Sequence, residues 1–519
     1  MIAVWNTLPA AQELLAAAQH YRYLIVCLPQ TTLPPLTLSE QPAAAERAFA
    51  QAWQQQTACI QFRAVNVFKQ LLPTAELWLL PPHEAPYLAD YVVHHAVNWQ
   101  TAPIEHIQRN TPKPWFCQPS SPAPKQVVVV GAGIAGAATA YALAKRGVRV
   151  RVLEAATIAH AASGNRQGLL YAKISPYPTA QTELLLGGYG YTHRLLAHLL
   201  PERDNWQVCG VLHLNHNATE SKRNVALAQQ HEHHHLYHAV SADQASALAG
   251  IPLAQDGLFW QHGAWLHPPA LVRALLNHPN ITVYQQQPLL HAQHDGSYWQ
   301  LTTPQHHFTA SHIVYCMGAN SPQLPALQAL PWQLIRGQTS LAPATPFSQQ
   351  LNIALSGASY ISPAWQGVHT YGASFVPHNS DTSWQEADEQ HNQTELAKLN
   401  ATLAHALQTQ AHTLRGHAAV RCDSPDHLPI MGRLGDAAAM QQIYAKLALD
   451  KNYRLHDACP YLPNVWLNSA HGSRGLSTAP WCAESIAADI LALPNPLSRN
   501  LREALHPNRY IIRAIVRQK

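Results

Sequence analysis

The chain has 519 residues, which at roughly 150 residues per domain corresponds to three domains, or to two if one is large. Hydrophobic residues make up 47% and charged residues only 12%, against a usual charged share of roughly 25%, which excludes a disordered or strongly solvated chain. The formal net charge of +4 is too small to indicate a nucleic-acid-binding protein by itself.

The eight cysteines are widely and irregularly spaced, and none forms a CxxC pair. This spacing argues against a zinc ribbon or a disulfide framework and fits a reducing compartment. The first residues (MIAVWNTLPAAQELL) lack the basic start of a signal peptide. We therefore expect a cytoplasmic protein with no membrane span, although residues 127–144 carry no charge.

Glycine is absent from residues 1–130, and all 24 glycines lie from Gly131 onward. Tight turns that bring backbone close to a nucleotide generally need glycine, so no cofactor site is expected in residues 1–118. That region still contains a strand-like run at 23–28 and a helix-like run at 44–53. A proline-rich stretch at 112–124 predicts an extended linker, which we place at 119–125.

From residue 126 the pattern becomes α/β. Four valines at 127–130 predict a buried parallel strand, GAGIAG (131–136) a turn, 134–145 a helix and 148–153 a second strand that ends at Glu154. Gly131 would make the turn, Gly133 would admit a pyrophosphate, and Gly136 would let helix and strand pack closely. Glu154 would accept hydrogen bonds from a ribose. The combination predicts a dinucleotide site, but it does not separate NAD from FAD.

Later segments support a cofactor that lies extended across its domain. ASGNRQG (162–168) forms a second glycine-bearing loop, and HGSRGLSTAP (471–480) precedes a helix predicted at 481–491. Backbone N–H groups at such a helix start could stabilise negative charge on a reduced flavin, although a plain loop and N-cap is an equal alternative for that segment alone. A strand is also predicted at 208–214.

These motifs carry a resemblance. With CGVLHL, GAWLHPPALVRALL, RGQTS, VRCDSPDHLPIMG and LHPNRYIIRAI, they make residues 125–519 similar to the FAD-dependent C-terminal module of the bifunctional tRNA-modifying MnmC family, within the glycine oxidase and D-amino-acid oxidase superfamily. The resemblance implies a Rossmann-like FAD-binding fold with an antiparallel substrate domain. FAD-binding parts would span about 126–205, 270–330 and 415–500, and substrate parts about 206–269 and 331–414.

The implied activity is removal of the carboxymethyl group from 5-carboxymethylaminomethyl-(2-thio)uridine at the tRNA wobble position, giving the 5-aminomethyl nucleoside and glyoxylate. A free amino-acid oxidase of the glycine or sarcosine type is the alternative, and a non-catalytic tRNA-binding protein is a third. In the family the N-terminal half is an S-adenosylmethionine-dependent methyltransferase. Because residues 1–118 lack glycine, we expect a small, shortened α/β remnant there without that activity.

The resemblance also implies the residues that contact FAD. They are Gly131, Gly133, Ile134, Ala135, Gly136, Glu154, Ser163, Gly164, Asn165, Gln167, Gly168, Gly318, Gly472, Ser473, Arg474, Gly475 and Leu476.

The family's substrate carries a carboxylate, which in a dry site calls for the planar fork of an arginine. Arg421 matches the superfamily's carboxylate clamp, with a structural salt bridge as the alternative. Arg474 is expected either to contact flavin or to assist the clamp. Arg336 could face the same cavity, although structural pairing is as plausible, and Tyr360 is the candidate phenol beside the substrate.

A histidine cluster and a basic C-terminal segment could each suggest a further binding site. The cluster HEHHHLYH (231–238) lacks remote cysteine or carboxylate partners, so we expect a solvated helix or loop rather than a metal site. The C-terminal segment is basic, and we expect it to contact tRNA phosphates, with a solvated helix end as the alternative. Its cations are Arg499, Arg502, Arg509, Arg513, Arg517 and Lys519.

Overall fold

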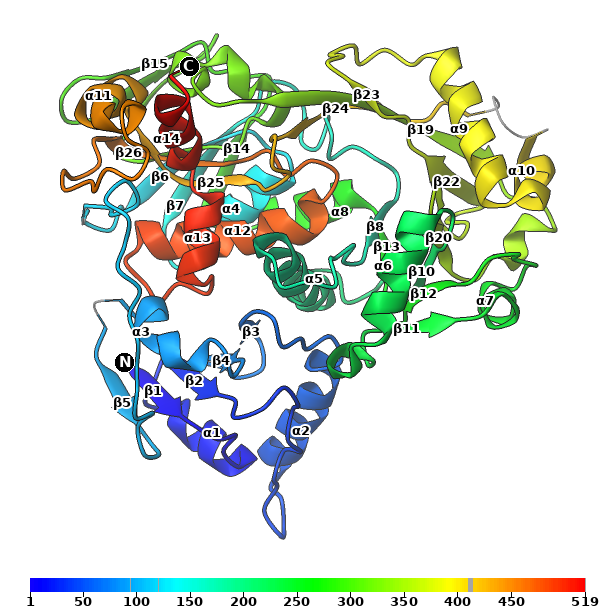
Figure 1. Cartoon of the computed structure of the whole chain (residues 1–519), viewed down its shortest axis with the longest axis horizontal. Coiled ribbons are helices and arrows are strands. Elements are labelled where there is room, and N and C mark those ends of the chain that lie inside the picture. Colours follow the sequence, from blue (N-terminus) through cyan, green and yellow to red (C-terminus); the bar gives the residue numbers. More distant parts are fainter. Residues whose placement is uncertain (94, 120, 409–413, 519) are drawn as a thin grey trace.

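The computed structural model describes residues 1–93, 95–119, 121–408 and 414–518, so Lys519 lies outside the described residues. Figure 1 shows three regions: an N-terminal sheet (blue), a central parallel sheet, and a large antiparallel sheet on the right of the view. No described helix is long and apolar enough to cross a membrane. The fourteen α-helices of the described residues are α1 (Ala11–Ala17), α2 (Ala44–Gln56), α3 (Leu88–Tyr91), α4 (Ile134–Ala144), α5 (Ala180–Leu199), α6 (Ala218–Ala228), α7 (Ala242–Ala249), α8 (Pro268–Leu276), α9 (Glu386–Leu399), α10 (Ala401–Gln408), α11 (Ala437–Ile443), α12 (Gly475–Ile490), α13 (Arg499–Leu505) and α14 (Asn508–Val516).

The central sheet is the one that positions the site. Its first five strands run parallel and the sixth antiparallel, in the order β14 (Ile281–Tyr284), β7 (Arg149–Leu153), β6 (Gln126–Val130), β18 (Ile313–Tyr315), β26 (Tyr461–Ser469) and β25 (Ile430–Gly435). Strand β6 is buried on both faces, as its run of valines predicts for a parallel strand. The predicted strand–turn–helix–strand unit is thus present as β6, α4 and β7.

The antiparallel sheet is assembled from distant parts of the chain. Its order is β11 (Tyr237–Val240), β12 (Gly257–Trp260), β10 (Val211–Leu214), β20 (Ala354–Ser356), β21 (Tyr360–Ile361), β22 (Val368–Gly372), β19 (Gln333–Pro343) and β23 (Val376–Pro377), with β24 (Ala418–Asp423) also paired to β19. All of its strand pairs are antiparallel except β10–β20, which is parallel. The prediction of one strand over 208–214 is wrong, because two strands, β9 (Trp206–Val208) and β10, lie there. Gly210 has φ of +83° and separates these two strands, which join different sheets.

Two small sheets complete the oxidase portion. They comprise β8 (Gly168–Leu170), β13 (Ala264–Leu266) and β9 (Trp206–Val208), and β15 (His291–His294), β16 (Trp299–Thr302) and β17 (His307–Ala310).

Helix α12 begins six residues earlier than predicted, so Pro480 lies inside it. Proline has no N–H, which leaves the carbonyl of Leu476 without its usual helical donor. The hydroxyl of Thr192 on α5 supplies one at 2.9 Å. The predicted start at 481 is therefore wrong, because a hydroxyl of the neighbouring helix α5 allows the proline to lie within α12.

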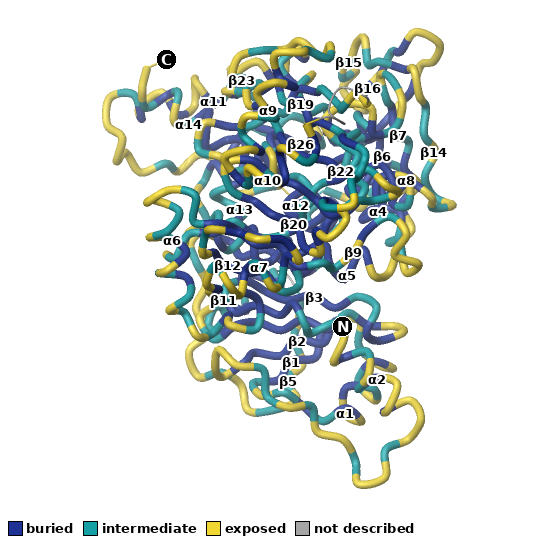
Figure 2. Tube along the Cα trace, turned by 90° about the vertical axis from the view of Figure 1, so that its right-hand side faces the viewer, coloured by how far each residue is buried: buried dark blue, intermediate teal, exposed yellow. Residues whose placement is uncertain are grey.

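The N-terminal region forms a five-stranded sheet of its own. The order is β3 (Asn66–Phe68), β4 (Glu76–Leu80), β2 (Tyr23–Cys27), β1 (Ile2–Trp5) and β5 (Val97–Trp99), parallel except for the β3–β4 pair. Figure 2 shows its buried strands beside exposed loops at the free end. One hydrophobic cluster runs continuously from this sheet into the buried faces of α4, α5 and α12.

The contact between the two regions also buries charge. Glu484 on α12 is 1% exposed and pairs with Lys69 of the N-terminal region and with Lys145 and Arg146 at the end of α4, the last two at 2.8 Å. Burial alone would raise the pKa of Glu484, but these three cations hold it well below its ordinary value. The N-terminal region is therefore joined to the two helices that begin at the site.

The histidine-rich segment is solvated only in part: His231 and His234 are exposed as predicted, whereas His233 and His235 contact the N-terminal region. His233 is 1% exposed, and its Nε2 accepts the backbone N–H of Phe62 at 3.2 Å. The Nε2 of His235 lies 2.7 Å from the carbonyl of Ile60. Burial holds the pKa of His233 at about 3, so this ring is neutral. Histidine serves here as a packed hydrogen-bonding side chain.

The segment that precedes the central sheet is anchored at residues 115–119. Trp115 and Phe116 are buried, and the carbonyl of Trp115 accepts hydrogen bonds from Tyr461 and Asn508. The carbonyl of Pro119 accepts one from Arg433 at 2.9 Å. The proline content predicted an extended linker, and Trp115 and Phe116 anchor this segment to the oxidase portion.

Candidate functional site

A cavity of about 500 Å³ lies between the central sheet and the antiparallel sheet. Parallel strands place their carboxyl ends at one edge, where an α/β sheet usually binds its ligand. The lining comes from that edge, from the 155–169 loop, from β19 and β24, and from the start of α12. Predicted contact residues that line it are Gly131, Gly133, Ile134, Ala135, Glu154, Ser163, Asn165, Gly168, Gly318, Gly472, Ser473, Gly475 and Leu476.

The glycine turn has the geometry needed to approach a phosphate. Gly133 is the N-cap of α4, and a Cβ built on it would meet only the Ser163 hydroxyl, at 3.2 Å. That hydroxyl accepts the N–H of Ile134 at 3.0 Å, so the second glycine loop crosses the start of the helix. A Cβ on Gly136 would lie 1.8 Å from the carbonyl oxygen of Gly131, so this position can only be glycine.

Glu154 stands at the end of β7 as predicted, and it lines the cavity. Its two carboxylate oxygens accept the N–H groups of Ala132 at 2.7 Å and Ala156 at 2.8 Å. The carboxylate therefore fixes the shape of the glycine turn as well as facing a ligand.

Arg421 lies on β24 and borders the cavity. Its Nη2 donates to the carbonyl of Ser374 at 2.9 Å, the one hydrogen bond of this guanidinium within the described chain. Burial lowers its pKa, yet arginine stays protonated in proteins, so a positive charge with free donors faces the cavity. A Cβ on Gly337 of β19 would come 1.9 Å from that Nη2, so glycine there makes room for the guanidinium.

Tyr360 on β21 is held near Arg421. Its hydroxyl accepts from Asn165 Nδ2 at 3.0 Å and donates to the carbonyl of Gln167 at 3.3 Å. Burial raises its pKa, although Asn165 and Arg421 oppose the rise, so the phenol is neutral. The phenol and the guanidinium border one cavity.

Five predicted site residues do not line the cavity. Gly136 packs against the turn behind it, Gly164 lies against His417, and Gln167 is buried with its amide donating to the carbonyl of Pro363. Arg474 starts α12 with a buried Nη1 that has no hydrogen-bond partner among the described residues. Arg336 is fully buried and forms an ion pair with Asp388 at 2.6 Å. Its charge is neutralised within the antiparallel sheet, which corrects the expectation that it could face the cavity.

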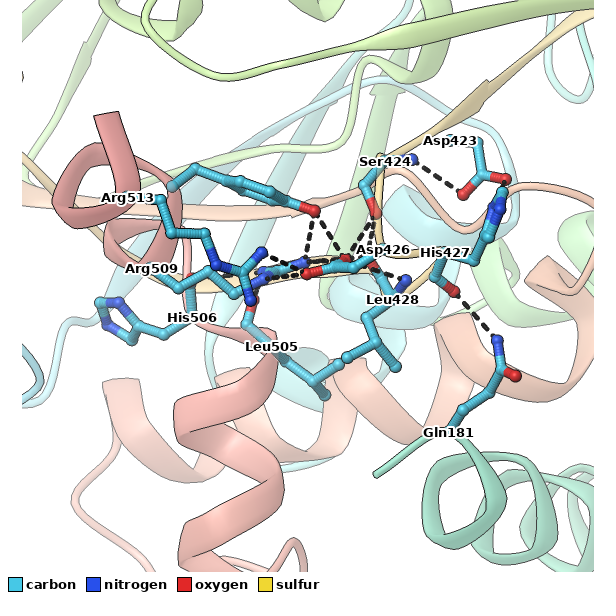
Figure 3. Close-up of polar contacts among 11 residues, drawn as sticks. Gln181, Asp423, Ser424, Asp426, His427, Leu428, Leu505, His506, Arg509 and Arg513 are labelled. Atoms are coloured by element: carbon cyan, nitrogen blue, oxygen red, sulfur yellow. Dashed lines mark hydrogen bonds and ion pairs between the residues drawn. The ribbon is translucent and has the colours of Figure 1, made fainter. Parts of the chain in front are cut away.

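The basic C-terminal segment is internal only in part: Arg513 and Arg517 are exposed, so RNA contact by them stays a prediction, and Lys519 lies outside the described residues. Arg499 and Arg509 are buried, and Arg502 pairs with Asp489. Figure 3 shows Arg509 and Arg513 directed at Asp426, at 3.0 and 2.7 Å. Burial alone would raise the pKa of Asp426, but these arginines and the Tyr510 hydroxyl hold it well below its usual range. Because Asp426 follows β24, the C-terminal helix α14 supports the strand that bears Arg421.

Several lining residues were missed by the sequence analysis. Thr339 Oγ1 donates to Asn165 Oδ1 at 3.1 Å, and His417 Nε2 lies 2.8 Å from the carbonyl of Ala161. His471 sits between Asn468 and Thr478, and burial holds its pKa at about 3, so the ring is neutral. The motif HGSRGL was visible, but nothing in the sequence showed which of its side chains turn inward.

Comparison with known proteins gives the same architecture. The family model described as FAD dependent oxidoreductase matches residues 126–489. By structure, the chain is similar to glycine oxidase from Geobacillus kaustophilus (TM-score 0.59, 18% identity, 74% of this chain and 98% of that one). It is equally similar to iminodiacetate oxidase from Chelativorans sp. BNC1 (TM-score 0.59, 15% identity, 73% and 98%). At these identities the likeness shows the fold alone.

By sequence, the chain is 41% identical over 412 residues to the "tRNA 5-methylaminomethyl-2-thiouridine biosynthesis bifunctional protein MnmC" of Pseudomonas entomophila, covering 78% of this chain and 63% of that protein. It is 40% identical over 412 residues to the protein of the same name from Chromobacterium violaceum, covering 78% and 62%. The chain thus spans less than two thirds of these relatives. The glycine turn, the open Gly133 and the helix start fit FAD, and the chain belongs to the FAD dependent oxidoreductase (DAO) family.

Proposed function

We propose that this protein removes the carboxymethyl group from 5-carboxymethylaminomethyl-(2-thio)uridine at the wobble position of tRNA. One observation carries the proposal: a half-buried, charged Arg421, with donors unused by the described residues, borders the cavity of a chain 41% identical to an MnmC protein. The substrate offers a carboxylate next to a methylene and a secondary amine. An arginine fork binds such a carboxylate through two parallel hydrogen bonds.

The reaction balances as follows. The methylene between amine and carboxylate loses a hydride and the nitrogen loses a proton, which creates a C=N bond. Water then adds to that carbon, and cleavage of the C–N bond yields the 5-aminomethyl nucleoside and glyoxylate. FAD, when bound, supplies the two-electron acceptor for the hydride. The residues proposed to hold it are those of the glycine turn, the 163–168 loop and the start of α12.

The residues of the chain are assigned roles of binding and orientation. Arg421 holds the carboxylate and thereby fixes the methylene, and positioning of this kind accounts for much of catalysis when reacting atoms are held within about 3–3.5 Å. The neutral Tyr360 phenol offers a hydrogen bond beside it. Arg474, with its unpartnered Nη1 buried near Tyr171 and Asp423, is proposed to orient the loop that starts α12.

A free amino-acid oxidase is the second candidate, since the same clamp would accept glycine or sarcosine. One experiment separates them. Purified protein is mixed anaerobically with tRNA carrying the modified uridine, with unmodified tRNA, or with sarcosine, and the flavin absorbance is followed in a single turnover. Rapid bleaching by modified tRNA, with aminomethyl-uridine recovered on nucleoside analysis, is the expected result. Bleaching by sarcosine alone would replace the proposal with the second candidate.

A further inference from the structure

Phe375 stands out among the phenylalanines of the chain. All eight lie in the described residues, and Phe375 is 57% exposed, whereas the other seven are buried or partly buried. Single exposed apolar side chains are ordinary on a protein surface, so the exposure of Phe375 matters only because of its place beside the site.

The segment that carries Phe375 adjoins the cavity. Ala373, two residues earlier, lines the cavity, and the carbonyl of Ser374 accepts the hydrogen bond from Arg421. The next strand, β23, then pairs with β19 and holds the segment in place. The backbone on both sides of Phe375 is thus fixed while its side chain projects to solvent at the edge of the site.

Arg421 also contacts the ring directly. Its guanidinium carbon lies 5.8 Å from the centre of the Phe375 ring, within cation–π range. One side of the ring therefore meets the residue proposed to bind the carboxylate, while much of the rest is open to solvent. A flat apolar surface beside a cation is what stacks a nucleobase in single-stranded RNA sites.

The dimensions of the proposed substrate match this spacing. Four bonds separate the uracil ring from the carboxylate carbon, an extended reach of roughly 5 Å from standard bond lengths. The centre of the Phe375 ring lies 5.8 Å from the guanidinium carbon of Arg421. A substrate whose carboxylate is held by Arg421 can therefore place its uracil ring against Phe375. We propose that Phe375 is a specificity residue that stacks on the pyrimidine base bearing the reacting side chain, an inference that rests on the function proposed above.

The test compares three substrates in anaerobic flavin reduction. They are an anticodon stem-loop RNA with the modified uridine, the free modified nucleoside, and sarcosine, which has the carboxymethylamine but no base. Phe375→Ala should lower the second-order rate with both base-containing substrates by about 5- to 150-fold, the usual effect of removing one stacking aromatic. The rate with sarcosine, however slow, should be unchanged. Phe375→Tyr and Phe375→Trp, which keep an aromatic ring, should retain the parent rate with both base-containing substrates.

Tyr298, 50% exposed on the turn before β16, provides a matched control, and Tyr298→Ala should behave as the parent protein. A loss confined to the stem-loop would mean that a neighbouring base stacks, which overturns the assignment to the modified base. An equal loss with all three substrates would mean that Phe375 merely positions Arg421. Unchanged rates would also refute stacking. If the parent protein fails to react with modified RNA, the proposed function fails instead.

Discussion

The contact between the N-terminal region and α12 and the cavity of the oxidase portion both bury charge, but they do so in opposite ways. At the contact, Glu484 pairs with Lys69, Lys145 and Arg146, and Glu76 also pairs with Lys69 and Arg146, so every charge has an opposite partner. In the cavity, Glu154 is held by backbone N–H groups, and Arg421 is held by one carbonyl. Fully paired charges fix regions of the chain together, whereas partly paired charges remain available to a ligand.

The largest expected effect lies at the contact. Glu484→Gln leaves three cations facing only Glu76, which pairs with Lys69 and Arg146 but has no ion pair with Lys145. Loss of one partner from a buried ion-pair cluster typically costs about 3–5 kcal/mol of unfolding free energy. Urea unfolding should show that loss. The surface pair Lys398–Glu395, with the lysine 61% exposed, is the control, and Lys398→Ala should change stability by less than about 1 kcal/mol. Similar stabilities for both variants would show that the buried cluster does not bind the regions together.

The next effect contrasts two arginines on paired strands. Arg421→Lys keeps the charge but loses the planar fork, so flavin reduction by modified tRNA should slow by roughly 30- to 1,000-fold with flavin content unchanged.

Arg336→Lys should instead lower the melting temperature, because this arginine forms a fully buried ion pair with Asp388. If Arg421→Lys reacts at the parent rate, the carboxylate clamp lies elsewhere.

A third prediction concerns the glycine turn. Gly133→Val should fold, since the only contact of its Cβ is a hydroxyl at 3.2 Å, but it should bind FAD at least roughly tenfold more weakly because the side chain enters the phosphate path. Flavin absorbance per protein and titration with FAD measure this. Gly136→Val, by contrast, should lose stability as well, because its Cβ overlaps the Gly131 carbonyl. Full flavin content in Gly133→Val would contradict the assigned phosphate loop.

The smallest effect is a dependence on pH. Burial raises the pKa of Glu183, at the start of α5, to about 8, with Glu84 adding to the rise and Ser498 opposing it. In the folded state Glu183 therefore keeps its proton up to about pH 8, whereas in the unfolded state it loses the proton above its ordinary pKa of 4.5. This group consequently lowers the free energy of unfolding as pH rises from about 4.5 to 8.

Glu183→Gln should thus raise the melting temperature at pH 8, and the gain should shrink at pH 5. Scanning fluorimetry across that range measures it, and a gain independent of pH would exclude ionisation of Glu183 as the cause.

Local patterns predicted the part of the fold that depends on neighbouring residues. Valine runs and glycine spacing located β6, the turn, α4 and β7, because burial on both faces and close helix packing demand those residue types. Sequence did not reveal partners that lie far along the chain. Tertiary packing brings the Thr192 hydroxyl to the Leu476 carbonyl, which allows Pro480 to lie within α12. It also brings the Asp426 carboxylate into an ion pair with Arg509.

The same limit applies to the site. Arg421 was assigned to the clamp by resemblance, whereas the sequence left Arg336 open between the cavity and structural pairing. Only the position of Asp388 on α9 shows that Arg336 is the paired arginine and that Arg421 keeps free donors among the described residues. The sequence likewise did not reveal that His233 and His235 form hydrogen bonds with a region about 170 residues earlier.

The interleaved order of the central sheet has a consequence for biosynthesis. β26 lies directly beside β18, yet β18 is made far earlier on the ribosome, and the cavity is closed only by residues up to Leu476. A nascent chain therefore carries an unpaired β18 edge and an incomplete glycine-turn site until α12 has emerged, a state that exposes apolar surface to aggregation. Flavin insertion must follow synthesis of nearly the whole polypeptide, so ribosome-bound chains that stop before β26 should be colourless.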